Sequence, residues 1–278
     1  MTPDLLGGTP ELSISEEAPL ADAPGQGTPT LICFPSAGLA SSIVGHYIIQ
    51  RLKLPRIAAF RSPFLISASV ILDGRPNPPI RVHGNRKVAV VVSEFPPSPS
   101  LLTYLARAII GWLKDKGMAP AYVVEGVLQR QDEEEGGEAG KEAPMTSVPT
   151  KDDGVIVAIP ATDSAERVLT QLNFPRLDQG VVGGLTGDLL NEAAHEQFNL
   201  SVLFARIGEA EIPEYRAAAH LLQALDKLVP DLNVDPEPLL KQAEVLERML
   251  RESMKMSTGS SGAERTPTAQ VREPSIYG

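Results

Sequence analysis

Cysteine is almost absent from this sequence of 278 residues, in which Cys33 is the single example. One cysteine cannot form a disulfide within the chain, and such scarcity is typical of proteins kept in a reducing compartment. Cys33 lies in the apolar run Leu31–Phe34, so we interpret it as a small buried hydrophobic residue.

Long hydrophobic runs are also missing. No uninterrupted apolar segment approaches the length that spans a bilayer. The first residues, Met1–Asp4, lack the basic and apolar regions of a signal peptide. We therefore expect a cytoplasmic protein that has no membrane as a partner.

Positively charged residues are outnumbered: 25 Lys and Arg stand against 35 Asp and Glu, so the formal net charge is −10. The segment Gln131–Asp153 carries eight carboxylates against two lysines, and it has almost no large apolar residue. Such a segment cannot offset its own ordering entropy, so residues 131–153 are predicted to form a disordered acidic loop within the domain. Neither this loop nor the rest of the chain offers the basic stripe that nucleic-acid binding requires.

Motifs for catalysis and metal binding are lacking too. No Gly-x-Ser-x-Gly sequence occurs, and Ser36 is interpreted as a turn serine. The histidines are scattered and form no His-Glu-x-x-His motif; they are His46, His83, His195 and His220. The prediction is therefore a protein that is not an enzyme and holds no metal or cofactor.

One glycine-rich stretch could bind a small ligand. Residues Gly180–Gly187 contain a short predicted strand, Val181–Val182, and lead into a predicted helix. Backbone N–H groups at such a helix start can hold an anion, although Asp188 in the first turn would repel a phosphate. The other interpretation is that the glycines permit a tight strand-to-helix turn.

Strand and helix patterns alternate along the chain, which predicts a three-layer α/β fold with a largely parallel sheet flanked by helices and two C-terminal helices. The run Val88–Val92 is continuous and β-branched, as expected for a strand covered on both faces. The main predicted strands are 28–34, 57–60, 87–93, 121–128, 155–159 and 200–207. The predicted helices are 41–53, 101–116, 164–172 and 185–196, followed by helices opening at Pro213 and at Asp235.

The expected domain organisation is simple. Residues 1–27 are predicted to be a flexible arm, residues 28–256 a single α/β domain, and residues 257–278 a flexible tail. The tail ends in Ile276-Tyr277-Gly278, a hydrophobic–Tyr–any pattern followed by a free carboxylate. Such an end can act as a tethered ligand, because the carboxylate can pair with a lysine of a partner while the ring supplies contact area.

The order of several short motifs resembles the proteasome assembly chaperone family over roughly residues 28–250. The stretches that carry the resemblance are Val44–Ile49, Ile71–Gly74, Lys87–Pro96, Gly111–Gly117 and Gly183–Gly187, with the closing helix pair between Pro213 and Leu250. The long N-terminal arm and the acidic insertion after Arg130 depart from the family pattern.

The resemblance implies a homo-oligomer whose Ile276, Tyr277 and Gly278 enter pockets between α subunits of the 20S proteasome core. It implies an assembly chaperone or an activator. Two alternatives stay open beside it. Relatives have been labelled as ATP-grasp-like ligases, and the turn at Gly180–Gly187 would suit a small-ligand or nucleotide-binding protein.

Overall fold

The structure is a computed structural model that describes residues 12–17, 22–128, 156–207 and 212–259. The acidic loop predicted at 131–153 and the C-terminal Ile276-Tyr277-Gly278 lie outside these residues. The large sheet has eight strands in the order β1-β3-β6-β7-β2-β8-β10-β9. These strands are β1 (Ser13–Glu16), β2 (Thr30–Cys33), β3 (Arg56–Arg61), β6 (Ile80–Gly84), β7 (Ala89–Ser93), β8 (Ala121–Leu128), β9 (Val157–Pro160) and β10 (Leu200–Ile207).

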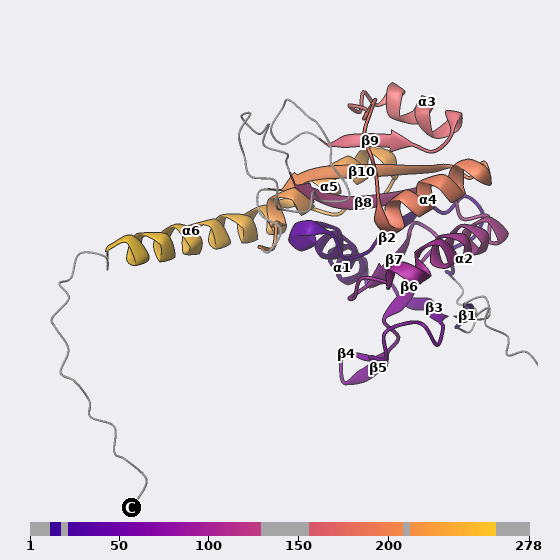
Figure 1. Cartoon of the computed structure of the whole chain (residues 1–278), viewed down its shortest axis with the longest axis horizontal. Coiled ribbons are helices and arrows are strands. Elements are labelled where there is room, and N and C mark those ends of the chain that lie inside the picture. Colours follow the sequence, from indigo (N-terminus) through magenta and orange to yellow (C-terminus); the bar gives the residue numbers. More distant parts are fainter. Residues whose placement is uncertain (1–11, 18–21, 129–155, 208–211, 260–278) are drawn as a thin grey trace, which may run out of the picture.

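The centre of the sheet is parallel and its edges are antiparallel. Strands β7, β2, β8 and β10 run in one direction, whereas β6, β3 and β1 on one side and β9 on the other alternate with their neighbours. Between β3 and β6 the chain forms a separate hairpin of β4 (Val70–Leu72) and β5 (Arg75–Asn77), which protrudes at the bottom of Figure 1.

Helices cover the sheet on both faces, which confirms the predicted three-layer α/β fold (Figure 1). The helices are α1 (Ala40–Leu52), α2 (Leu102–Asp115), α3 (Asp163–Gln171), α4 (Gly184–His195), α5 (Tyr215–Leu228) and α6 (Glu237–Gly259). Helix α1 packs beside α5 on one face, and α2 packs beside α4 on the other. None of the helices in this part of the chain combines the length and apolarity needed to cross a bilayer.

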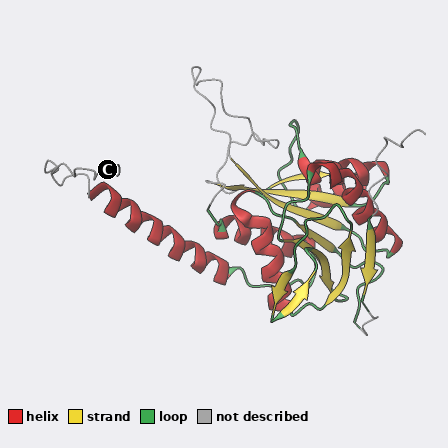
Figure 2. Cartoon of the chain, turned by 60° about the horizontal axis from the view of Figure 1, so that its bottom comes forward, coloured by secondary structure: helices red, strands yellow, loops and turns green. Residues whose placement is uncertain are grey.

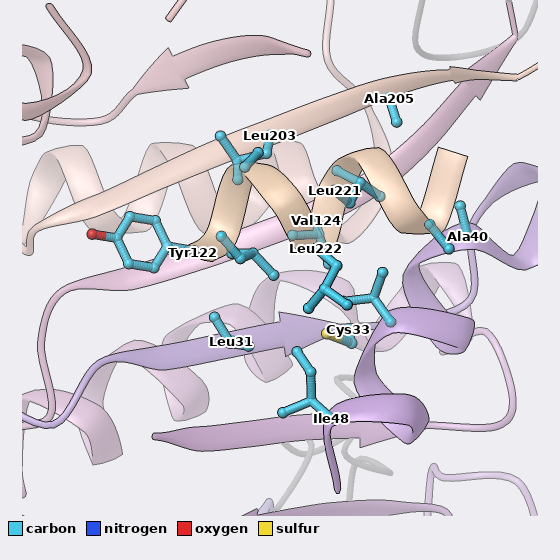
Figure 3. Close-up of a cluster of buried hydrophobic side chains, with 14 of the residues drawn as sticks. Leu31, Cys33, Ala40, Ile48, Tyr122, Val124, Leu203, Ala205, Leu221 and Leu222 are labelled. Atoms are coloured by element: carbon cyan, nitrogen blue, oxygen red, sulfur yellow. The ribbon is translucent and has the colours of Figure 1, made fainter. Parts of the chain in front are cut away.

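Side chains of the central strands alternate between two cores, because successive strand residues point to opposite faces. Leu31 and Cys33 of β2 pack under α1 and α5, whereas Ile32 packs under α2 and α4. Figure 3 shows the first core, in which Leu221 and Leu222 of α5 lie over β2. Burial on both faces explains the continuous apolar run at β7, as predicted from the sequence.

Sequence patterns located most elements of the large sheet but missed β1 at its edge and β6 inside it. β1 forms within residues 1–27, which we predicted to be a flexible arm, and it pairs with β3 from Ser13 opposite Arg61 to Glu16 opposite Ala58. β6 was not predicted, since a Pro-rich segment precedes it. Val181 and Val182 do not form a strand and instead lie in the turn before α4, while α6 continues past residue 256, the predicted domain limit, to Gly259.

A buried ion pair joins β6 to the end of β7. Arg81, whose exposed fraction is 1%, donates to both carboxylate oxygens of Glu94 at 2.6 and 2.7 Å. His46 of α1 places Nε2 2.9 Å from the same carboxylate, so the helix is tied to this end of the sheet. Two stretches of the sequence resemblance, Val44–Ile49 and Lys87–Pro96, therefore meet at one carboxylate.

Burial and the neighbouring charged groups shift the pKa values of Glu94 and His83 in this cluster. Burial alone would raise the pKa of Glu94, but the hydrogen bonds from His46 and Arg81 lower it to about 2. Burial lowers the pKa of His83 to about 4. The neutral imidazole of His83 suits its neighbours, because Nδ1 lies 3.0 Å from the Leu54 carbonyl oxygen and Nε2 accepts from Arg81 Nε at 3.2 Å.

Gly45 allows α1 to pack closely against β2 and β7. A Cβ at this position would lie 2.7 Å from Cys33 Cβ and 3.0 Å from Val92 Cγ1. We predict that Gly45→Ala lowers the free energy of unfolding by about 1–3 kcal/mol through overpacking. Gly111→Ala in α2 is the control, since a Cβ there meets nothing within 4 Å. Urea titration should show Gly111→Ala unchanged or more stable, and equal losses for both variants would contradict the packing argument.

We predict that Glu94→Gln destabilises the protein by about 3 kcal/mol, because the Arg81 guanidinium stays buried without a compensating charge. The exposed Glu196, which pairs with Lys114 at 2.6 Å, supplies the control variant Glu196→Gln. Chemical denaturation should separate the two clearly. A loss no larger for Glu94→Gln than for Glu196→Gln would show that the buried pair is dispensable.

Acid should destabilise the protein in two steps, whose sign follows from the lowered folded-state pKa values. His83 binds its proton more readily in the unfolded chain, so stability falls as pH drops from about 6.5, its ordinary value, to about 4. Glu94 contributes stability that is complete above its ordinary pKa of 4.5 and is lost as pH falls toward about 2. Thermal melts between neutral pH and pH 3 would measure this, and a melting temperature independent of pH would contradict it.

Candidate functional site

A cleft opens where the central strands end. The chain passes from β2 to α1 on one face of the sheet and from the adjacent β7 to α2 on the other face. The two connections therefore diverge beyond the carboxyl ends of these strands. Ligands of open α/β sheets bind in crevices of this kind. The cleft here has a volume of about 210 Å³. The end of β2, the middle of β8, the segment after β7 and the first turn of α4 all line it.

One wall of the cleft is the turn after β2. Gly126 of β8 permits this turn, because a Cβ there would collide with the Ala37 carbonyl oxygen. The Ser36 hydroxyl oxygen accepts a hydrogen bond from the Gly126 N–H at 3.1 Å. Ser36 is therefore a turn residue, as the sequence predicted, and it also lines the cleft.

The opposite wall is the glycine-rich turn before α4. Gly184 has a φ of 64°, a left-handed conformation that favours glycine. A Cβ at Gly187 would collide with the Val182 carbonyl oxygen. The backbone therefore needs glycine at both positions, which agrees with the tight-turn interpretation of Gly180–Gly187.

A carboxylate that sequence reasoning missed lies inside the cleft. Glu125 of β8 is half-buried, and the Thr186 hydroxyl donates to its Oε2 at 2.6 Å. Burial raises the pKa of Glu125, and the Thr186 hydrogen bond offsets only part of this. The sequence feature that could have indicated this residue is a single glutamate in the otherwise apolar strand β8. Asp188, which we expected to repel a phosphate, accepts a hydrogen bond from the Thr103 hydroxyl of α2 at 3.2 Å.

The remaining candidate residues do not assemble into a reactive site. Cys33 is fully buried, and burial raises its pKa to about 12, which confirms the interpretation as a small core residue. His46 and His83 lie in the ion-pair cluster, whereas His195 and His220 lie on α4 and α5. Within residues 12–17, 22–128, 156–207 and 212–259, no group of His, Cys, Asp or Glu could hold a metal ion.

The predicted partner-binding residues Ile276, Tyr277 and Gly278 follow α6 and lie beyond the described part of the chain. Helix α6 packs against α5 through Leu239 and Ala243 and then leaves the α/β body (Figures 1 and 2). Their role in partner binding therefore stays a prediction.

Comparisons with known proteins agree with this architecture. Pyrococcus furiosus PbaA, whose crystal structure is described as an archaeal homologue of proteasome-assembly chaperone, superposes with a TM-score of 0.71 and 24% identity over 91% of this chain and 95% of PbaA. Pyrococcus furiosus PbaB, described as an archaeal proteasome activator, gives a TM-score of 0.68 and 15% identity over 88% of this chain and 99% of PbaB.

Two sequence comparisons extend over most of the chain. An uncharacterised protein of Methanocaldococcus jannaschii is 29% identical over 220 residues, which are 79% of this chain and 82% of that protein. The PAC2 family matches residues 31–254, a range that includes the whole parallel core of the sheet, both flanking layers and most of α6. The protein therefore belongs to the PAC2 family.

Proposed function

We propose that this protein is a proteasome assembly chaperone or activator that binds the α ring of the 20S core through Ile276, Tyr277 and Gly278. The observation that carries the proposal is a hydrophobic–Tyr–any C-terminus on a chain of the PAC2 family. The shared fold with PbaA and PbaB supports it, since those two proteins are described as a chaperone homologue and a proteasome activator.

The terminal residues have the chemistry of a docking peptide. The carboxylate of Gly278 can pair with a lysine at the base of a pocket, and the Tyr277 ring buries a large area while its hydroxyl makes one hydrogen bond. Ile276 fills a small apolar slot. Pockets between neighbouring α subunits are the expected receptor.

The geometry of α6 favours docking at a distance from the body. This helix projects from the α/β layers and ends at Gly259 (Figure 2). The nineteen residues that follow, 260–278, would span at most roughly 65 Å if fully extended. A tail on such a support can reach a partner ring without contact between the ring and the sheet.

A single short tail binds weakly, so the proposal includes a homo-oligomer that presents several tails at once. The body exposes large apolar side chains at two places suited to contacts between copies. The exposed side chains on the segment between β3 and β5 are Phe64, Ile66, Ile71 and Leu72, and those on α6 are Val245 and Met249. Binding of several tails would either help α subunits assemble or shift the core particle toward an open gate.

We predict that Tyr277→Ala, or deletion of Ile276–Gly278, weakens binding to purified 20S particles by more than about tenfold, because an aromatic anchor dominates a small interface. Adding one residue after Gly278 should have the same effect, since it displaces the carboxylate. Surface plasmon resonance with immobilised 20S particles measures all three changes.

Ser275→Ala is the matched control, because it alters the tail next to the motif and should leave binding unchanged. Circular dichroism and light scattering establish that each variant keeps its fold and oligomer mass. If the truncated protein binds 20S particles as tightly as the full chain, the tail is not the docking element and the proposal fails.

A further inference from the structure

The cleft beside the end of β2 and the middle of β8 is not used by tail docking, and its chemistry points to a ligand of its own. We propose that it binds a small α-amino acid with an apolar side chain. The inference rests on a carboxylate, on backbone donors and on an apolar wall, all within one cavity of about 210 Å³.

The carboxylate of Glu125 supplies a site for an ammonium group. Its Oε2 accepts from Thr186, while its Oε1 makes no hydrogen bond to another residue of the described chain. No Lys, Arg or His is among the described residues that line the cleft. A half-buried carboxyl with no cationic partner is unfavourable in the empty protein, and a ligand ammonium would remove this penalty.

The first turn of α4 supplies donors for a carboxylate. Gly184, Leu185 and Thr186 all line the cleft, and their backbone N–H groups have no acceptor among residues 12–17, 22–128, 156–207 and 212–259. Gly183 is the N-cap residue of this helix and has no side chain of its own to accept from these N–H groups. N–H groups at a helix start carry partial positive charge and are suited to a carboxylate oxygen.

The two charges together restrict the ligand. A simple anion at the helix start would be repelled by Glu125, and a simple cation at Glu125 would be repelled by the positive end of α4. An α-amino acid carries both groups on adjacent atoms and has no net charge. It can therefore satisfy the carboxylate and the N–H donors at the same time.

The rest of the cleft suits an aliphatic side chain. Phe34, Leu102 and Leu189 line it, together with Pro96 and Pro97 from the segment that follows Glu94. The volume is below the range of about 300–1,000 Å³ that is typical for drug-sized ligands, so a molecule of amino-acid size is the appropriate occupant. The Arg81–Glu94 pair holds the segment that carries the two prolines.

The test compares three probes that differ only in their polar groups. Leucine carries both groups, isopentylamine lacks the carboxylate and isocaproate lacks the ammonium. Each is titrated into the full-length protein and followed by amide chemical shifts in NMR. We expect leucine to bind more tightly than either of the others and to shift the amides of Ser36, Gly126 and Gly184–Thr186.

Substitutions in the cleft test which residues contact leucine. Glu125→Gln should weaken leucine binding by at least about tenfold, because a charged hydrogen bond is lost, and should leave isocaproate no weaker. Glu192→Gln is the control, since this glutamate of α4 pairs with Arg107 outside the cleft. If Glu125→Gln does not fold, Leu102→Trp fills the cleft instead and should also prevent leucine binding.

Several results would overturn the inference. They are no leucine binding at millimolar concentration, unchanged binding in both Glu125→Gln and Leu102→Trp, and tighter binding of isocaproate than of leucine. The last result would mean an anion site formed by the helix start alone. None of these outcomes bears on 20S binding, so this inference and the proposed function fail independently.

Discussion

The four parallel strands at the centre of the sheet bury both of their faces, and the rest of the molecule is arranged around this requirement. A strand such as β7, with every residue from Ala89 to Ser93 buried, is stable only if helices cover it above and below. Parallel strands also need long connections, and these connections are the helices that provide the cover. The sheet and its two helical layers are therefore one cooperative unit.

The same arrangement creates the cleft. Because the connections after β2 and β7 leave on opposite faces, the space beyond the strand ends cannot be filled by one helix. Backbone turns close around it: Gly126 allows the turn after β2 to approach β8 closely, and Gly184 supplies the positive φ of the turn before α4. The fold therefore supplies the cleft, and the side chains that line it determine its chemistry. Among the described residues that line it, Glu125 is the one that can carry a charge.

Two partly buried acidic groups show how differently the fold treats charge. Glu94 is paired with Arg81 and His46, so its charge is compensated inside the protein and ties α1 to the sheet. Glu125 has only a neutral hydroxyl partner, Thr186, among its described contacts. The first arrangement stabilises a charged carboxylate, whereas in the second burial disfavours the charged form of the carboxyl group. This contrast, rather than either residue alone, separates a structural cluster from a candidate binding site.

Sequence by itself determined the α/β class, the order of the main helices and central strands, the core role of Cys33 and the likeness to proteasome assembly chaperones. These features depend on local periodicity, turn residues and short motifs, all of which can be recognised in the sequence. Tertiary structure decided the pairing of β1 with β3, the existence of β6, the meeting of His46 with Glu94 and the placement of Glu125 beside Thr186. The pairing of β1 with β3 and these two polar contacts join residues that are 42 to 61 positions apart. No local pattern encodes such contacts, because they exist only once the sheet has brought the segments together.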